Sequence, residues 1–236
     1  MFYWIEGYSK EMVRPVKGAA KKQPAPRAYD SSRRQAQARE TQRHIAECAR
    51  ELFVERGYTA TSIRDIADRA GVAVQTIYNA FDGKPAIVNR ISDMAVVGDD
   101  EPVALAERDE IVAIATATDP VDLLDRWTRM CAGIFSRFLP ILPMLHEAVA
   151  SEPIVRERWR TNAIDDRYAG TLATARRLGD LGALPPDLPV DEAADLMWAL
   201  ASFESAHALM VERGWTAEQF AAGLRRTFVA LLGLEA

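Results

Sequence analysis

The chain has 236 residues, 49% of them hydrophobic, and a formal net charge of −5, which predicts a folded protein of one or two domains with a sizeable core. No segment approaches the run of about 18 apolar residues that crosses a bilayer, and Glu6 interrupts the apolar start of the chain too early for a signal-peptide core. We therefore expect a cytoplasmic protein with no membrane partner. The two cysteines, Cys48 and Cys131, have no C-x-x-C spacing, which argues against a disulfide framework or a zinc site.

The charge is distributed unevenly along the chain. Residues 1–44 contain ten Lys or Arg against four Asp or Glu, whereas residues 45–236 contain 19 against 30. Residues 1–30 also lack steady periodicity and contain three prolines, so we interpret them as a flexible basic arm. Such an arm could enter a DNA minor groove, and a solvated tail explains the same composition equally well. The basic residues that could enter the groove are Lys17, Lys21, Lys22, Arg27, Arg33 and Arg34.

Beyond the arm, the apolar residues recur at helical spacing, and no strand-like alternation or repeat interrupts them, which predicts an all-α fold. Glycine, proline and acidic caps mark the helix ends. We expect helices at about 32–56, 62–70 and 74–80, and a weakly amphipathic helix that ends near residue 118. Further helices are expected at 119–138, at 140–150, from 153 to before Gly182, at 191–213 and at 217–232. Residues 182–189 are expected to form a loop.

The segment Tyr58–Lys84 is the most informative, because it fits two short helices and a tight turn into fewer than 30 residues. Thr61 or Ser62 can cap the first helix, and Asp65 follows Ser62 at the capping-box spacing. Gly71 supplies the left-handed residue of the turn. The second helix would bury Ile77 and turn Gln, Thr, Tyr and Asn side chains outward. Such a surface is typical of the recognition helix of a helix-turn-helix, which reads the DNA major groove.

At this point the sequence resembles the tetracycline-repressor (TetR-type) family of bacterial regulators. The resemblance runs through Ile45–Phe53, Gly57–Ala67, Ala70–Val72 and Thr76–Phe81, with Lys84 beyond. It implies a three-helix DNA-binding domain at residues 31–92, followed by a helical effector-binding and dimerisation domain at 93–236. The chain departs from the family pattern at Ala73, Asn79, Ala80, Gly83 and Pro85.

The resemblance also implies roles for individual residues in the helix-turn-helix. Thr61, Thr76, Tyr78 and Lys84 would contact the DNA backbone, and Arg64, Val74 and Gln75 would face the bases. The chemistry fits, because an arginine can bind guanine with two hydrogen bonds, a glutamine can bind adenine in the same way, and valine can touch a thymine methyl. The full set of expected DNA-binding residues is Thr61, Ser62, Arg64, Val74, Gln75, Thr76, Tyr78, Asn79 and Lys84.

The domain at residues 93–236, called the body below, contains large apolar side chains at helical spacing. The family has an effector pocket and a dimer interface in this domain. Pocket candidates are Trp127, Met130, Cys131, Phe135, Met144 and Trp159. Interface candidates are Trp198, Phe203, Met210, Phe220, Leu224 and Phe228. Aromatic residues at this spacing are more often plain core than ligand contacts. We expect no cofactor, and a small hydrophobic effector as the ligand.

Catalysis is not indicated. The histidines His44, His146 and His207 lie in unrelated segments, and no nucleophile elbow or glycine-rich phosphate loop is present. The sequence therefore predicts a DNA-binding transcription regulator, interpreted as a ligand-responsive repressor that binds a palindromic operator as a homodimer. The alternative is a helical small-molecule-binding or interaction protein with a vestigial helix-turn-helix. The sequence does not distinguish repressor from activator.

Overall fold

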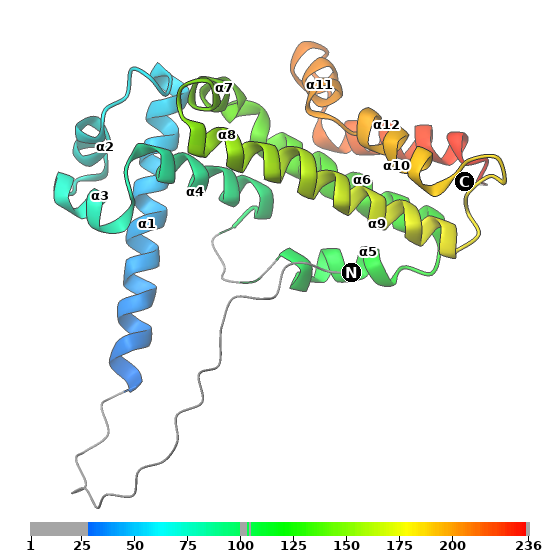
Figure 1. The fold of residues 1–236 in the computed structure, drawn as a ribbon, viewed down its shortest axis with the longest axis horizontal. Helices are drawn as coiled ribbons and strands as arrows, with labels where there is room; N and C mark the ends of the chain where they lie inside the picture. The colour runs from blue at the N-terminus through cyan, green and yellow to red at the C-terminus, as the bar shows by residue number, and fades with distance from the viewer. Residues whose placement is uncertain (1–27, 100–102, 104, 235–236) are drawn as a thin grey trace, which may run out of the picture. The chain divides into compact units, whose positions relative to one another are not determined.

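The computed structural model describes residues 28–99, 103 and 105–234, and these residues contain helices and no strand, which confirms the predicted all-α fold (Figure 1). The elements are α1 Ala28–Arg56, α2 Ile63–Ala70, α3 Val74–Ala80, α4 Lys84–Val97, η1 Leu105–Glu107, α5 Asp109–Thr116, α6 Pro120–Phe138, η2 Leu139–Ile141, α7 Leu142–Ser151, α8 Pro153–Arg160, η3 Thr161–Asp166, α9 Arg167–Asp180, α10 Val190–Leu200, α11 Phe203–Ala206, η4 His207–Glu212 and α12 Ala217–Leu231. None of these helices is long and apolar enough to cross a membrane.

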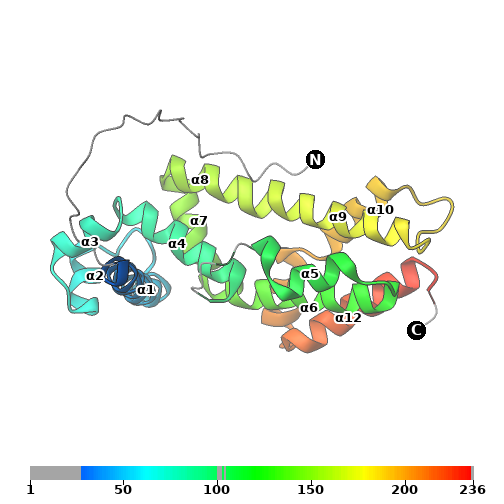
Figure 2. The same cartoon turned by 90° about the horizontal axis from the view of Figure 1, so that it is seen from below.

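The chain divides into two compact units, Met1–Ala36 and Gln37–Ala236. In the first unit, the described residues are the start of α1, and most of the expected basic arm lies outside the described residues. The second unit contains the helix-turn-helix and the body, so every contact discussed below lies within it. In the body, α12 packs along α6, and α10 packs along α9 (Figures 1 and 2).

Two apolar cores support the second unit. The first joins the inner faces of α1, α2, α3 and α4 to residues between the end of α6 and the start of α8. The residues that it takes from this later segment are Phe138, Ile141, Met144, Leu145, Ala148 and Val155. The second core lies among α6, α9, α10 and α12. The core of the helix-turn-helix therefore extends past residue 92 into the body, and α7 contributes side chains to it.

The structure corrects one expected helix. The segment expected to run continuously from about Asp191 to Arg213 ends at Leu200, and a new helix begins at Phe203. Ser202 causes this restart, because its hydroxyl accepts from the Ser205 amide while the Ser205 hydroxyl accepts from the Ser202 amide, which forms a capping box. Apolar periodicity continues through the break and hides it. The expected helix from Pro153 to before Gly182 is present, and six residues in its middle, Thr161–Asp166, have π-helical hydrogen bonding.

The N-termini of α2 and α3 differ in a way that can be measured. Ser62 caps α2 by accepting from the Asp65 amide, whereas Ala73 caps α3 without any side-chain hydrogen bond. Ala73 already has the extended backbone that a capping serine adopts. We expect Ala73→Ser to raise the free energy of unfolding by about 0.5–1 kcal/mol, and Ser62→Ala to lower it by about 1 kcal/mol. Urea unfolding followed by circular dichroism would test both, and a destabilised Ala73→Ser variant would contradict the expectation.

Candidate nucleic-acid interface

The first helix of the motif, α2, begins with a complete capping box. The Ser62 hydroxyl accepts from the Asp65 amide at 3.1 Å, and the Asp65 carboxylate accepts from the Ser62 amide at 2.8 Å. Hydrogen bonds from Ser62 lower the pKa of Asp65, so this carboxylate stays ionised at the positive end of the helix. Ile66, Ala67 and Ala70 are buried. The cap and the buried face fix α2, and Arg64 remains exposed on it.

The turn after α2 has the expected geometry. Gly71 has φ +66°, and its amide donates to the Ala67 and Asp68 carbonyls, which ends the helix. Val72 is half-buried against the first core. Ala73 then starts α3 in an extended conformation. The chain therefore reverses within three residues, which brings α2 and α3 into contact, as a helix-turn-helix requires.

The second helix, α3, buries Ile77 alone. Thr76 is half-buried. Its remaining long side chains are exposed, and they are Val74, Gln75, Tyr78 and Asn79. Tyr78 is 55% exposed although it is aromatic, so its ring is presented to solvent rather than used as core. This surface is uncharged and rich in groups that can donate or accept hydrogen bonds.

Two amides on α3 are already oriented in the free protein. Gln75 Nε2 donates to Asn79 Oδ1 at 3.0 Å, one helical turn apart. This bond uses one of the two amide hydrogens of Gln75. The other hydrogen and the carbonyl oxygen remain, and these are the donor and acceptor that bidentate recognition of adenine needs.

Thr61, which precedes α2, is buried, and Lys84, which begins α4, is half-buried. Thr61 is 1% exposed, and its hydroxyl donates to the Gly57 carbonyl at 2.8 Å. In this structure the Thr61 hydroxyl is buried and bonded within the protein, so a DNA contact through it would require this bond to break. Lys84 Nζ donates to the Tyr58 carbonyl at 2.9 Å and to the Thr61 carbonyl at 3.0 Å. The ammonium is half-buried, and it keeps one donor for another partner.

The basic side chains around the motif are matched in number by acidic ones. Residues 45–91 contain six Lys or Arg and six Asp or Glu. Arg69 pairs with Glu51 and Glu55, at 3.2 and 2.9 Å. Among the described residues, Arg64 has no hydrogen-bond or ion-pair partner, so its full donor set faces solvent. Arg64 is thus the guanidinium of α2 that a nucleic acid can recruit without breaking an existing bond.

Comparison with known proteins identifies a family that this arrangement resembles. Residues 45–91 match the family model described as bacterial regulatory proteins, tetR family. Over these residues the chain is similar to the tetR family of bacterial regulatory proteins. The match covers α2 and α3 entirely, together with the C-terminal part of α1 and the first part of α4. The helix-turn-helix that the geometry shows therefore lies in the segment that matches this family, whose members are transcription regulators rather than enzymes.

The similarity to TetR-family proteins extends into the body. The HTH-type transcriptional regulator TtgR of Pseudomonas putida is 28% identical over 173 residues, which cover 69% of this chain and 77% of TtgR. The structure of a SmeT–triclosan complex matches with a TM-score of 0.63 and 18% identity, and covers 81% of this chain and 90% of SmeT. A transcriptional regulator from Saccharomonospora viridis in complex with choline matches with a TM-score of 0.60 and 22% identity, over 81% of this chain and 96% of that chain. The structural matches show the shared fold.

The expected effector-pocket residues are mostly core. Trp127, Cys131, Phe135 and Met144 are buried, and Trp159 packs in an aromatic cluster with Phe138 and Phe203. Burial raises the pKa of the Cys131 thiol to about 12, so it is not a thiolate. Of the six residues, Met130 lines the cavity that lies among α4, α5 and α6.

That cavity has a volume of about 410 Å³ and lies among α4, α5 and α6. Its apolar lining consists of Val96, Val97, Val103, Leu105, Ile111, Met130 and Ile134. Arg137 also lines it and donates to the Ala95 and Val96 carbonyls at 2.7 and 2.9 Å, so one cavity residue caps the end of α4. Apart from Met130, sequence reasoning missed this lining, because short helix α5 forms one wall and carries no strong pattern.

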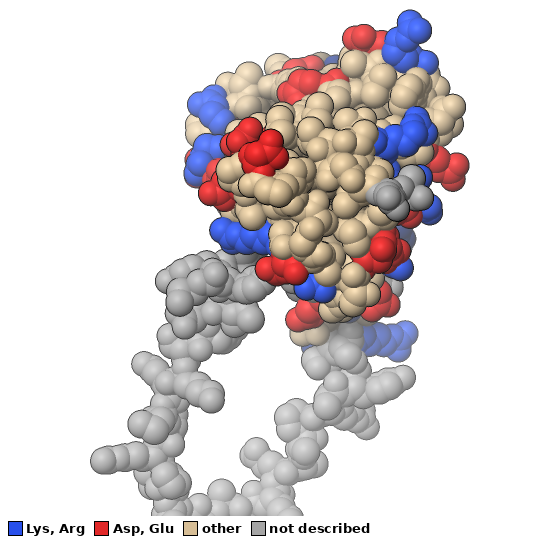
Figure 3. Space-filling model, turned by 90° about the vertical axis from the view of Figure 1, so that its right-hand side faces the viewer, with Lys and Arg blue, Asp and Glu red and all other residues tan. Residues whose placement is uncertain are grey.

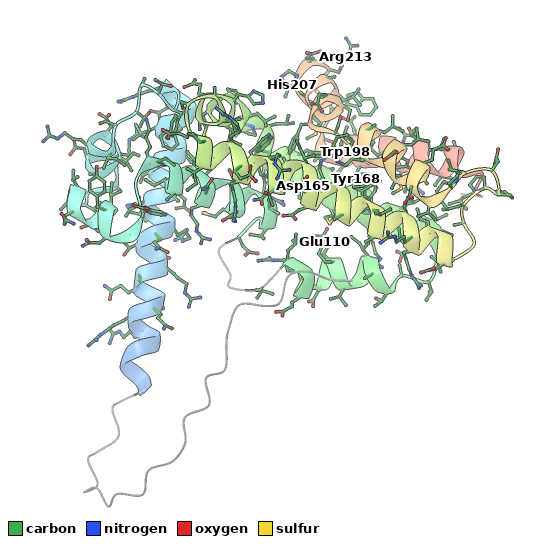
Figure 4. All side chains as sticks on the ribbon, viewed as in Figure 1. Glu110, Asp165, Tyr168, Trp198, His207 and Arg213 are labelled. Atoms are coloured by element: carbon green, nitrogen blue, oxygen red, sulfur yellow. The ribbon has the colours of Figure 1, made fainter. Side chains whose placement is uncertain are left out.

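The expected dimer-interface residues divide into two groups. Phe220, Leu224 and Phe228 are buried in the second core, whereas Trp198, Phe203 and Met210 are half-buried. Trp198 packs under the Arg167 guanidinium at 4.4 Å and against Tyr168 at 6.3 Å (Figure 4). The exposed large apolar residues of this region are Leu200, Val211 and Leu231. On the face seen in Figure 3, uncharged surface separates scattered acidic and basic side chains.

Proposed function

We propose that this protein is a TetR-family, ligand-responsive repressor that acts in the cytoplasm and binds a palindromic operator as a homodimer. The observation that carries the proposal is α3, a seven-residue helix that buries one residue and exposes an oriented Gln75–Asn79 pair beside Tyr78. A core helix would bury more of its surface. A helix that exposes this set is suited to the major groove.

Roles within the interface follow from exposure. Arg64, Val74, Gln75 and Asn79 are exposed and would face base edges. Tyr78 and Ser62 are exposed, Thr76 and Lys84 are half-buried, and these four would contact phosphates. Because residues 45–91 have equal numbers of basic and acidic residues, the basic residues 1–44 would supply additional attraction to DNA.

Dimerisation would use the last helices of the body. Leu200, Val211 and Leu231 are 39%, 55% and 39% exposed, and a second copy of the chain would cover these apolar side chains. A two-fold dimer would present two copies of α3 to a palindrome. Half-buried Trp198 and Met210 lie on the same helical segments and would extend this contact.

The effector would occupy the cavity among α4, α5 and α6. Its volume of about 410 Å³ suits a small molecule, and the apolar part of its lining would hold the hydrophobic effector. The rest of the lining is charged and consists of Glu107, Arg108, Asp109, Glu110 and Arg137. SmeT bound to triclosan and the Saccharomonospora viridis regulator bound to choline show that proteins of this fold hold small molecules. Arg137 connects the cavity to the end of α4, whose other end leads to α3. An effector can lower DNA affinity only by binding the DNA-competent and incompetent conformations unequally.

Selection from a random duplex pool tests the proposed DNA binding. We expect purified protein at near-physiological salt to recover a palindromic motif after sequencing. Half-sites alone should bind more weakly, because only one α3 is engaged. Recovery of no motif, with binding that disappears as salt rises, would mean that the protein grips phosphate without reading sequence, and would favour a helical ligand-binding protein.

Two substitutions separate base reading from backbone contact. We expect Tyr78→Ala to weaken binding to all duplexes by a similar factor, because a phosphate contact carries no sequence information. We expect Arg64→Ala to relax the preference at one position of each half-site, with a loss of about 1–3 kcal/mol of discrimination. Competition binding against operators with single base changes measures both effects. An unchanged preference in Arg64→Ala would remove this residue from the reading set.

Filling the cavity tests the effector site. We expect Met130→Trp to raise the dissociation constant of the neutral fluorescent probe N-phenyl-1-naphthylamine by roughly tenfold, because the larger ring occupies apolar space. Val112→Trp is the matched control, since Val112 lies on α5, is 45% exposed and does not line the cavity. Equal probe binding by both variants and the unmodified protein would place the effector elsewhere.

A further inference from the structure

The loop between α1 and α2 is held by the body of the protein. Tyr58 is 2% exposed, and its hydroxyl donates to Glu152 Oε1 at 2.9 Å. The Thr59 amide donates to Glu147 Oε2 at 3.1 Å. Glu147 lies on α7, and Glu152 lies between α7 and α8. Two carboxylates from the body therefore bind the five-residue loop Gly57–Thr61 that leads into α2.

Lys84 holds the same loop from the other side. Its ammonium donates to the Tyr58 and Thr61 carbonyls and lies 4.0 Å from the centre of the Tyr58 ring. Burial lowers the pKa of Lys84, and the charges of Glu152 and Glu147 oppose this shift. The loop thus lies between a cation from the start of α4 and two anions from the body. Charge-assisted hydrogen bonds of this kind are stronger and more directional than neutral ones.

Gly57 allows the loop to approach α7 closely. It has φ +85°, and a Cβ built there would lie 2.8 Å from Glu147 Oε1. Any other residue would therefore displace the carboxylate as well as strain the backbone. The glycine serves both to end α1 and to admit Glu147.

The position of Glu152 shows that its carboxylate serves the loop rather than its own helix. Glu152 is the last residue before α8 and occupies the N-cap position, where an acidic side chain could accept from the first amides of the helix. It makes no such cap bond. Its carboxylate reaches Tyr58 instead, across 94 residues of sequence.

We propose that Glu147 and Glu152 form a latch with Tyr58 and Thr59 that couples the α7–α8 junction to DNA recognition. The latch consists of the two hydrogen bonds from Tyr58 and Thr59 to these carboxylates. It rests on the proposed function, because coupling requires that the protein bind a specific operator. A shift of α7 or α8 would move the carboxylates away from the loop and release the start of α2, which carries Arg64. By reciprocity, operator binding would order the α7–α8 junction.

Hydrogen exchange with mass spectrometry tests the latch on the full chain. The probe duplexes are the operator recovered by selection and a scrambled duplex of equal length. In the unmodified protein, we expect the operator, and not the scrambled duplex, to slow exchange both at 63–80 and at the junction, residues 142–156. Tyr58→Phe removes the hydroxyl and keeps the ring. This variant should retain the slowing at 63–80, lose it at 142–156, and bind the operator about threefold to tenfold more weakly.

The controls separate coupling from a general structural effect. Glu157→Gln removes a carboxylate from α8, as Glu147→Ala removes one from α7. Among the described residues Glu157 pairs with Arg160, so the Glu157→Gln variant should behave as the unmodified protein does. Glu147→Ala, at an exposed position, should reproduce the loss at the junction even if Tyr58→Phe folds poorly. Undiminished slowing at 142–156 in Tyr58→Phe or in Glu147→Ala overturns the latch. Failure of the unmodified protein to bind any duplex overturns the proposed function, and the coupling with it.

Discussion

The shared apolar core is the constraint on which the DNA-binding surface depends. A seven-residue helix such as α3 is too short to be stable in isolation, because nucleation costs more than two helical turns return. With Ile77 as its single buried residue, α3 is held by what Ile77 packs against. That core includes Met144, Leu145 and Ala148 of α7. The orientation of the recognition helix is therefore determined partly by residues more than 60 positions further along the chain.

Electrostatics and readout are divided between different parts of this surface. The exposed residues of α3 carry no charge, so they suit base edges rather than generic phosphate attraction. On α2, Arg64 keeps all its donors, whereas Arg69 is paired with carboxylates of α1. Phosphate attraction is long-ranged and insensitive to sequence, while donor and acceptor patterns act at contact. A neutral recognition helix thus limits binding to sites whose pattern fits.

Local signals in the sequence were sufficient for the helix-turn-helix and insufficient for the site residues that depend on packing. Ser62, Asp65 and Gly71 act within a few residues of themselves, so their caps and turn could be predicted. Thr61 could not be placed, because whether its hydroxyl meets DNA or the Gly57 carbonyl depends on how the loop folds. In the body, helical periodicity indicated burial at Trp127 and Phe135 but could not distinguish a core wall from a cavity wall. Only the packing of α5 makes that distinction.

Apolar and polar contacts contribute differently where the helix-turn-helix contacts the body. Apolar packing is nearly non-directional, so the first core holds α7 against the DNA-binding helices but tolerates small shifts between them. Hydrogen bonds to a carboxylate weaken steeply with angle and distance, so the bonds from Tyr58 and Thr59 fix one relative position. A small displacement of the α7–α8 junction would thus cost little core packing and most of these two bonds. This combination of contacts holds the helix-turn-helix against the body. It also makes the position of the helix-turn-helix sensitive to movement of the α7–α8 junction.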